Sequence, residues 1–233
     1  MSTPVHARPQ PGLHTPLTDR TFAAVLFDMD GTLISSVGSV LRSWTRLAQE
    51  FQIPAERFGE FHGIPARTLL DSLLADRPVS ERERALRRVV ELEVDDVDDI
   101  ATLPGAADAL AALTPTGRCA IVTSCGRDLA QARLRVAGVR VPDVVVTADD
   151  VVHGKPDPEP FRTGAQRLGV DVRRCLVVED APAGIAAGRA AGAATLALRT
   201  TLGAQMVDGD LVVPDLGAVR FDVTPAGVRL RPA

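Results

Sequence analysis

The stretch VLFDMDGTLISS, residues 25–36, carries an apolar segment directly into two aspartates and a glycine. Residues 21–27 are nearly continuous in apolarity, which predicts a strand that is buried on both faces. Asp28 and Asp30 follow at the end of this strand, and Gly31 permits a sharp turn. Because aspartates also begin ordinary turns and cap helices, the pair alone does not separate a structural turn from a functional site.

The composition of the chain restricts the classes of ligand and partner that such a site could bind. The chain has 233 residues, of which 45% are apolar, enough for one domain or for one domain with an insertion. A net charge of -4 argues against binding to nucleic acid or to a membrane surface, because phosphate backbones and anionic lipids would repel it. No apolar run approaches the roughly 18 to 20 residues that span a bilayer. Residues 1–20 contain four prolines and are predicted to be a disordered tail rather than a signal peptide.

The cysteines predict a reducing compartment. Cys119, Cys125 and Cys175 lack the spacing of a metal site, and three thiols leave one unpaired in any disulfide scheme. We therefore expect a cytoplasmic protein in which Cys119 and Cys175 behave as small buried hydrophobic residues.

Strands and helices alternate along most of the chain. Short β-branched runs predict strands at 119–123, 143–147, 175–178 and 194–198, and segments with helical periodicity lie at 106–113, 127–137, 159–168 and 182–191. This alternation is typical of βαβ units and predicts a doubly wound, Rossmann-like α/β core with a parallel sheet. The core is assigned to residues 21–33 and 104–233. Near its end, residues 210–216 predict one more strand and residues 219–230 a hairpin.

One interval interrupts the alternation. Residues 34–103 contain no convincing strand and are predicted to form an all-helical insert. Its first helix is expected at 37–51, with apolar residues along one face, and further helices near 66–75 and 80–98. An insert that begins directly after the two aspartates can close over the strand ends. The acidic run at 91–100 is interpreted as a solvated helix end rather than a second metal site.

Further polar groups follow the other predicted strands. In open parallel sheets, ligands bind at the carboxyl ends of the strands. There the sequence places two hydroxyls, a lysine and two more acids, namely Thr123, Ser124, Lys155, Glu179 and Asp180. Each alone could be a helix cap or a surface turn. Four carboxylates, however, do not gather without cations, because like charges ~4 Å apart repel by about 4 kcal/mol at an effective dielectric of 20.

The cation and the ligand follow from the donor atoms. Oxygen-only ligands suit Mg²⁺, which keeps positions for water and a substrate phosphate. With Lys155 as a further positive charge, the site is predicted to bind a phosphoryl group. Asp28 is hypothesised to attack phosphorus and become an aspartyl phosphate. Asp30 is hypothesised to protonate the leaving alkoxide and later to deprotonate the attacking water. Gly31 is expected to bring backbone N–H groups to the phosphoryl oxygens.

Four motifs occur in order, each after a predicted strand: DMDGT at 28–32, IVTS at 121–124, GKPDP at 154–158 and VVEDAPAGIAAGRAAGA at 177–193. Together they resemble the motifs of the haloacid dehalogenase superfamily, over residues 21–216. Within that superfamily the chain looks most like phosphatases with a small helical cap after the first strand.

The resemblance implies a role for each matching position. Asp28 would be the nucleophile and Asp30 the general acid/base, as the residues themselves suggest. Thr123 would bind the phosphoryl group, and Lys155 would stabilise both the nucleophile and the phosphate. The ligands of Mg²⁺ would be Asp28, the main-chain oxygen of Asp30 and Asp180, and Glu179 would ligate the metal or act through a water molecule.

The substrate class also follows from resemblance. The chain is similar to phosphatases of sugar and polyol phosphates, including those acting on 2-deoxyglucose 6-phosphate and glycerol phosphate, so we expect a small phosphorylated metabolite as substrate and a monomeric enzyme. One alternative is a phosphosugar mutase of the β-phosphoglucomutase type, which has Thr and His where this chain has Ser36 and Val40. A second alternative is a non-catalytic phospho-ligand-binding domain, which Asp30 disfavours because a binder needs no acid at the leaving group.

Substrate selection is expected to lie in the insert. His62 and Arg67 flank the GIPA turn, which resembles the cap loop that reaches the active site in such enzymes. We hypothesise that Arg67 contacts the hydroxyls or the distal charge of the substrate, with His62 as a second candidate. Arg127, just after the predicted phosphate-binding loop, is a third, and Ser124 and Gly31 complete the expected substrate-binding set.

Overall fold

The centre of the fold is a parallel sheet of six strands. The computed structural model describes residues 16–57, 66–201 and 207–233. In this part of the chain the strand order is β6-β5-β2-β7-β8-β9, and every neighbouring pair is parallel. The predicted doubly wound sheet is therefore confirmed. Its strands are β2 (Ala24–Phe27), β5 (Cys119–Val122), β6 (Val144–Val146), β7 (Cys175–Glu179), β8 (Ala194–Leu198) and β9 (Leu211–Val213).

The position of β2 in this order determines where a ligand can bind. β2 pairs with β5 on one side and with β7 on the other, so that Phe27 aligns with both Ile121 and Val178. The order of the strands reverses at β2, and in open α/β sheets such a reversal opens a crevice at the carboxyl ends. The residues that follow β2, β5 and β7 are therefore neighbours.

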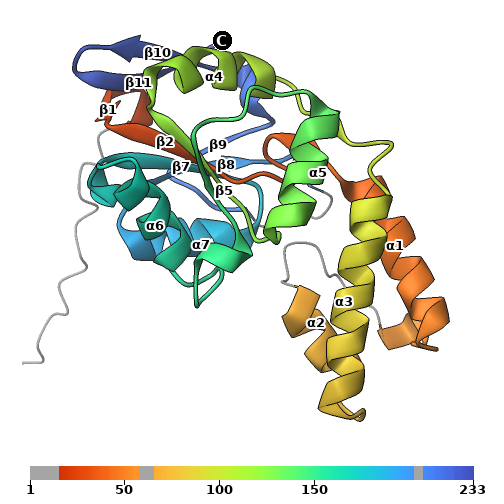
Figure 1. Ribbon diagram of the computed structural model, residues 1–233. Coiled ribbons are helices and arrows are strands. Elements are labelled where there is room, and N and C mark those ends of the chain that lie inside the picture. Colours follow the sequence, from red (N-terminus) through yellow and green to blue (C-terminus); the bar gives the residue numbers. More distant parts are fainter. Residues whose placement is uncertain (1–15, 58–65, 202–206) are drawn as a thin grey trace, which may run out of the picture.

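Helices cover both faces of the sheet (Figure 1). Val25 and Phe27 of β2 belong to an apolar cluster on one face, and Ala24 and Leu26 belong to a second cluster on the other. Because both faces of the strand are buried, its sequence shows no polar alternation. The first face is covered by α4 (Ala106–Leu113) and α5 (Arg127–Ala137), and the second by α6 (Glu159–Arg167) and α7 (Pro182–Ala191).

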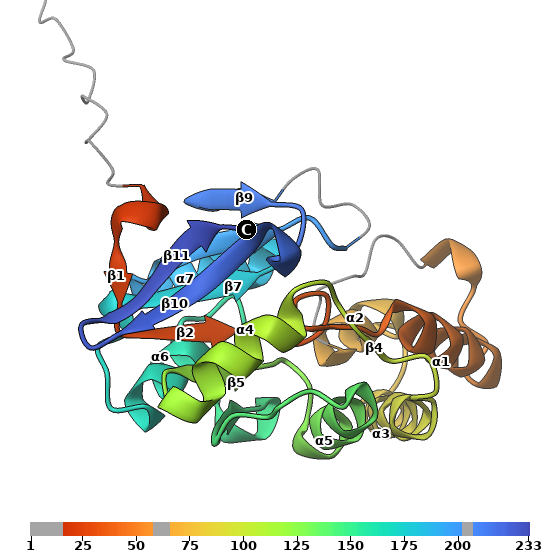
Figure 2. The ribbon, with the colours of Figure 1, turned by 90° about the horizontal axis from the view of Figure 1, so that it is seen from above.

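The single strand predicted at 21–27 is two strands. Thr21–Phe22 forms β1, which pairs antiparallel with β11, whereas β2 begins at Ala24. β10 (Val219–Thr224) and β11 (Gly227–Pro232) form the predicted terminal hairpin, which lies beside α4 (Figure 2). A continuous apolar run does not reveal that its two ends join different sheets, which explains the error.

Three α-helices form most of the described part of the insert between β2 and β5. They are α1 (Val37–Glu50), α2 (Ala66–Leu73) and α3 (Val79–Asp95). The expectation of an all-helical insert is corrected at its ends, where β3 (Ile34–Ser35) and β4 (Ala101–Thr102) pair antiparallel. The strands are too short for a periodicity to show in sequence.

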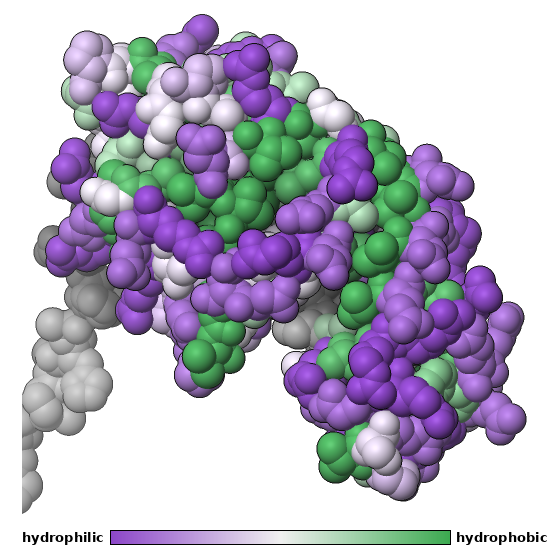
Figure 3. Space-filling model, viewed as in Figure 1, coloured by the Kyte–Doolittle hydropathy of each residue, from purple (hydrophilic) through white to green (hydrophobic). Residues whose placement is uncertain are grey.

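The insert has an apolar cluster of its own. Trp44 and Leu47 of α1 pack with Leu70 of α2 and Val89 of α3 in a cluster separate from those of the sheet. The face of the insert visible in Figure 3 is mostly hydrophilic. Contacts with the rest of the chain include those of α3 with α5.

Several smaller expectations are also resolved. Residues 1–15 lie outside the described residues, but Leu17–Asp19, within the predicted tail, forms a 3-10 turn and Leu17 is buried. All three cysteines are free, and Cys119 and Cys175 are buried as predicted. Among the described helices, none has the length and apolarity needed to cross a membrane.

Candidate active site

The candidate active site lies at the carboxyl ends of β2, β5 and β7. Asp28 follows β2, Thr123 follows β5, and Asp180 follows β7, whose last residue is Glu179. Lys155 comes from the loop between β6 and α6. All five residues are buried, so these members of the predicted set of polar groups are enclosed in the protein.

Lys155 is the centre of this group. Its Nζ donates to Asp28 Oδ1 at 2.6 Å, to Glu179 Oε1 at 2.7 Å and to the carbonyl oxygen of Val122 at 2.9 Å. Burial lowers the pKa of Lys155, but the two carboxylates outweigh burial and raise that pKa above its usual value. Lys155 is therefore a permanent cation between two acids.

The acids exceed this single cation. Asp28, Glu179 and Asp180 each offer one oxygen, and these oxygens lie within 4.8 Å of one another. Hydroxyls of Thr32, at 3.3 Å, and of Thr201 donate to Asp180. Burial, together with the Glu179 carboxylate, raises the pKa of Asp180 to about 7, and the same causes raise the pKa of Asp28. When all three are ionised, the cluster thus holds more negative charge than Lys155 alone balances, and the raised pKa values reflect this.

The donor set of this cluster fits Mg²⁺. Its three members are all carboxylates, with neither thiol nor imidazole among them. Mg²⁺ binds through a few carboxylates and keeps water and phosphate oxygens in its remaining positions. A divalent cation would also relieve the repulsion by Glu179 that, after burial, raises the pKa of Asp180.

Gly31 shapes the loop after β2. Its φ of 85° is in the left-handed region, and a Cβ at this position would overlap the Asp180 carboxylate. The predicted sharp turn is therefore present. However, the N–H of Gly31 donates to the carbonyl oxygen of Ile34 at 2.8 Å. This N–H is occupied within the turn itself, so the expected backbone N–H groups for the phosphoryl oxygens would come from other residues of the loop, and a contact with substrate stays a prediction.

The two hydroxyl residues after β5 differ in exposure. Thr123 is buried, and its Oγ1 accepts a hydrogen bond from the backbone N–H of Cys125 at 3.1 Å. This bond orients a hydroxyl whose own hydrogen can still be donated. Ser124 is exposed.

The carboxylate of Asp30 does not belong to the cluster around Lys155. Its Oδ1 accepts from Arg133 Nη1 at 2.9 Å and its Oδ2 from the thiol of Cys125 at 3.2 Å. The prediction that four carboxylates converge is therefore wrong for one of them. Arg133 supplies the counter-charge of Asp30, so this acid does not depend on the cation of the other three.

Arg133 is a residue that the sequence reasoning missed. It lies on α5, is 2% exposed, and shares the buried face of the helix with Leu129, Ala130 and Leu134. A charged residue on an apolar helix face requires a partner, and this was the signal in the sequence. Beside it, burial and the Asp30 charge raise the pKa of Cys125 well above its usual value, so this cysteine remains a thiol.

Other ion pairs hold the arginines predicted to select the substrate. Arg67, at the start of α2, pairs with Glu83 of α3 at 2.5 Å. Arg127 pairs with Asp150 at 2.8 Å. His62 lies outside the described residues. A contact of these side chains with substrate stays a prediction.

Fold and site together define a class of α/β proteins in which acids and a lysine gather at the carboxyl ends of the central parallel strands, where open sheets bind their ligands. Residues 22–192 match the haloacid dehalogenase-like hydrolase family. The chain belongs to this family.

The relatives give the type of reaction. The chain is 37% identical over 205 residues to hexitol phosphatase A of Escherichia coli (strain K12), which covers 87% of this chain and 95% of the relative. It is 34% identical over 204 residues to glycerol-1-phosphate phosphohydrolase 2 of Saccharomyces cerevisiae, covering 82% and 80%. A hydrolase from Pseudomonas syringae superposes with a TM-score of 0.73 at 28% identity, over 83% of this chain and 94% of the other. The chain is a phosphoric monoester hydrolase.

Proposed function

We propose that this hydrolase is a Mg²⁺-dependent phosphatase of small phosphorylated sugars or polyols that works through an aspartyl phosphate. The observation that carries the proposal is the buried Lys155 between Asp28 and Glu179, next to Asp180. Likeness to phosphatases named for hexitol and glycerol phosphates supports the substrate class. Residues 34–103 are proposed as the cap domain of a cytoplasmic monomer, and the three free thiols support the reducing compartment.

Asp28 and Asp30 have different roles in the proposed reaction. Asp28 attacks phosphorus, and a bond from its carboxylate oxygen forms while the bond from phosphorus to the leaving alkoxide breaks. Because Lys155 holds Oδ1 of Asp28, the attack is assigned to Oδ2. Asp30 gives a proton to the leaving alkoxide. Asp30 then takes a proton from water, which attacks the phosphorus and releases phosphate and free Asp28.

The remaining groups are proposed to balance charge. Asp28, Glu179, Asp180 and the main-chain oxygen of Asp30 would hold Mg²⁺, which supplies positive charge for the phosphoryl oxygens when bound. Lys155 adds a fixed positive charge beside the nucleophile. The hydroxyl of Thr123 would donate to a phosphoryl oxygen.

Within the described part of the chain, the geometry gives the two alternatives no support. Ser36 is buried at the start of α1, and Val40 packs against the apolar cluster of the insert. Neither supplies the imidazole with which a β-phosphoglucomutase would hold a sugar hydroxyl. A non-catalytic binder would need no acid at the leaving group, and so would not need a network that holds Asp30.

The decisive assay measures phosphate release from hexitol, glycerol and deoxyhexose phosphates and from nucleotides, with Mg²⁺ and with EDTA. We expect release with Mg²⁺, none with EDTA, and none from an Asp28→Asn variant. Full turnover in EDTA or by Asp28→Asn would contradict the mechanism. Release confined to nucleotides would contradict the substrate class.

The proposed role of Arg67 in selection has its own test. Arg67→Ala is expected to raise KM for the best polyol phosphate and to leave an aryl phosphate unchanged, since an aryl phosphate lacks the hydroxyls. Glu83→Gln is the matched control, because it removes the ion-pair partner of Arg67 but keeps the arginine. If Arg67→Ala affects both substrates equally, the proposed contact is wrong.

A further inference from the structure

A buried chain of polar side chains joins the insert to Asp30. Arg133 of α5 donates from Nη1 to Asp30 Oδ1 at 2.9 Å and from Nη2 to Glu93 Oε2 at 3.2 Å. Glu93 lies on α3, and its second oxygen accepts from Trp44 Nε1 of α1 at 3.0 Å. The chain therefore runs from α1 through α3 and α5 to the loop after β2.

This chain is enclosed along most of its length. Trp44, Glu93 and Arg133 are 4%, 8% and 2% exposed. Glu93 belongs to the acidic run at 91–100, so the interpretation of that run as a solvated helix end is wrong at this residue. A buried carboxylate and a buried guanidinium are each costly without a partner, by several kcal/mol. The two groups are therefore strongly constrained to remain together.

The arginine divides its donors between two parts of the molecule. A guanidinium is planar and presents its N–H groups in a fixed fork. Nη1 can reach Asp30 while Nη2 reaches Glu93 only if α3 holds one position relative to the loop after β2. If Arg133 served only an ion pair within the core, Asp30 would suffice as its partner and the contact with Glu93 would not be needed.

The second oxygen of Asp30 completes the arrangement. Oδ2 accepts from the Cys125 thiol at 3.2 Å, and Arg133 Nη1 also lies 3.3 Å from that sulfur. Both oxygens of the carboxylate thus have donors from the α5 side, and one of these donors, Arg133, also contacts the insert.

We propose that Arg133 is a positioning residue through which Glu93 and Trp44 of the insert set the orientation of the Asp30 carboxylate. The proposal rests on the proposed function of Asp30 as the acid for the leaving group. When the insert is in the position described here, Arg133 fixes the direction in which the Asp30 carboxylate points. When Glu93 is removed, the arginine loses its second partner and Asp30 its fixed orientation.

The test separates proton transfer from all other steps. Phosphorylation of the enzyme is measured in single turnovers, with enzyme in excess, for glycerol phosphate and p-nitrophenyl phosphate. The alkoxide needs a proton on departure, whereas nitrophenolate does not. Arg133→Met and Glu93→Gln are expected to slow the first substrate about 10- to 100-fold and the second less than about 3-fold. In these variants the rate of enzyme phosphorylation is then expected to depend more steeply on the basicity of the leaving group than in the wild type.

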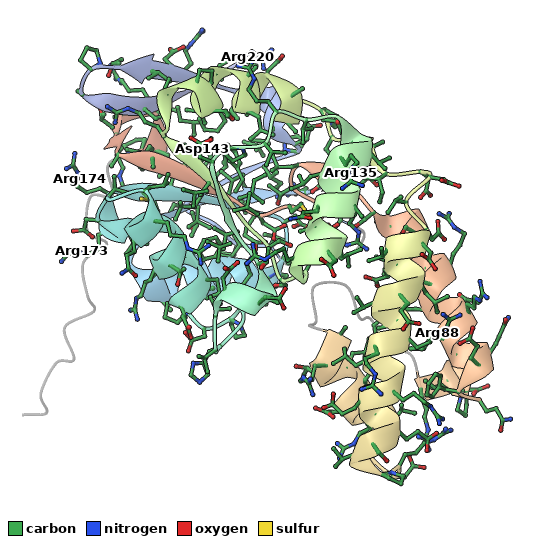
Figure 4. All side chains as sticks on the ribbon, in the orientation of Figure 1. Arg88, Arg135, Asp143, Arg173, Arg174 and Arg220 are labelled. Carbon is green, nitrogen blue, oxygen red and sulfur yellow. The ribbon has the colours of Figure 1, made fainter. Side chains whose placement is uncertain are left out.

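Matched variants control for surface effects and for folding. The controls are Arg135→Met and Glu91→Gln. Arg135 lies two residues further along α5, on its exposed side (Figure 4), and Glu91 is an exposed acid of α3. Both are expected to keep wild-type rates on both substrates. Arg133→Met combined with Glu93→Gln removes both buried charges, and serves if a single variant fails to fold.

The outcomes distinguish this proposal from the proposed function. Equal slowing of both substrates, or no slowing, would overturn the positioning role while leaving the phosphatase intact. A wild-type enzyme that forms no aspartyl phosphate would overturn the function itself. In an Asp30→Asn background, adding Arg133→Met is expected to cause no further loss, because both changes act on the same group. An additive loss would overturn the proposal.

Discussion

Lys155 illustrates how one residue sets the charge balance of the site. Its ammonium contacts Asp28 and Glu179 within 2.7 Å and lies 5.1 Å from the ring centroid of Phe161. The sequence offered Lys155 as a possible surface turn beside two prolines. Burial rules out a surface turn. If the lysine moved to the surface, the carboxylates of Asp28 and Glu179 would stay buried without a compensating charge.

Replacing Lys155 is expected to affect activity and stability together. Lys155→Met leaves Asp28 and Glu179 buried without their cation, so we expect destabilisation by ~3–5 kcal/mol, measured by urea unfolding. The loss of kcat/KM is expected to be at least about 100-fold. Adding Asp28→Asn should recover part of the stability but no activity. If the double variant is no more stable than Lys155→Met, the charge argument is wrong.

The elements show where sequence reasoning succeeded and failed. α4 and α7 were predicted to the residue, because each has a clear apolar face between turn residues. The division of 21–27 between two sheets was missed, since apolarity reports burial and not the partner strand. Asp30 was identified, but its contact with Arg133 depends on the packing of α5, which no local pattern encodes.

The first turn of α7 is closely fitted to the site. A Cβ on Gly184 would overlap the carboxylate of Glu179, which receives Lys155. Gly184→Ala should therefore displace Glu179, destabilise the fold by ~1–3 kcal/mol and lower kcat/KM. Ala186→Gly, on the exposed side of the same helix, is the control: it should cost about 1 kcal/mol without changing kcat/KM. If both variants have equal activity, the close contact does not matter for the site.

An ion pair between α1 and α3 predicts that the stability of the fold depends on pH. Arg88 of α3, labelled in Figure 4, binds Glu50 of α1 at 2.7 Å and lowers the pKa of Glu50 from 4.5 to about 2. A carboxyl group with a lowered pKa stabilises the fold above its unfolded pKa and loses this contribution as pH falls toward its folded pKa. Glu50→Gln should therefore be less stable than wild type at pH 7, and the difference should shrink between pH 4.5 and 2. Urea unfolding across this range measures it, and a difference independent of pH would exclude the ion pair as its source.

At the scale of the whole molecule, the site links metal binding to folding. A ligand that binds only the folded chain stabilises it by about 2.7 kcal/mol at 100 times its Kd. Mg²⁺ should therefore raise the melting temperature of the wild type. Asp180→Asn should abolish this increase, yet without Mg²⁺ it should melt no lower than the wild type, because it removes one of three mutually repelling acids. A lower melting temperature in EDTA would show that Asp180 stabilises the fold by itself.

The separate apolar cluster of the insert has a consequence for how such enzymes diverge. Because α1, α2 and α3 pack on one another and join the core through the short β3–β4 pair, their sequences can change without repacking the sheet. Substrate range can thus drift while the chemistry stays fixed. Glu93 is an exception to this freedom, since it must still meet Arg133. A chimaera that takes its insert from a relative should work only when the donor brings an acid matched to that arginine.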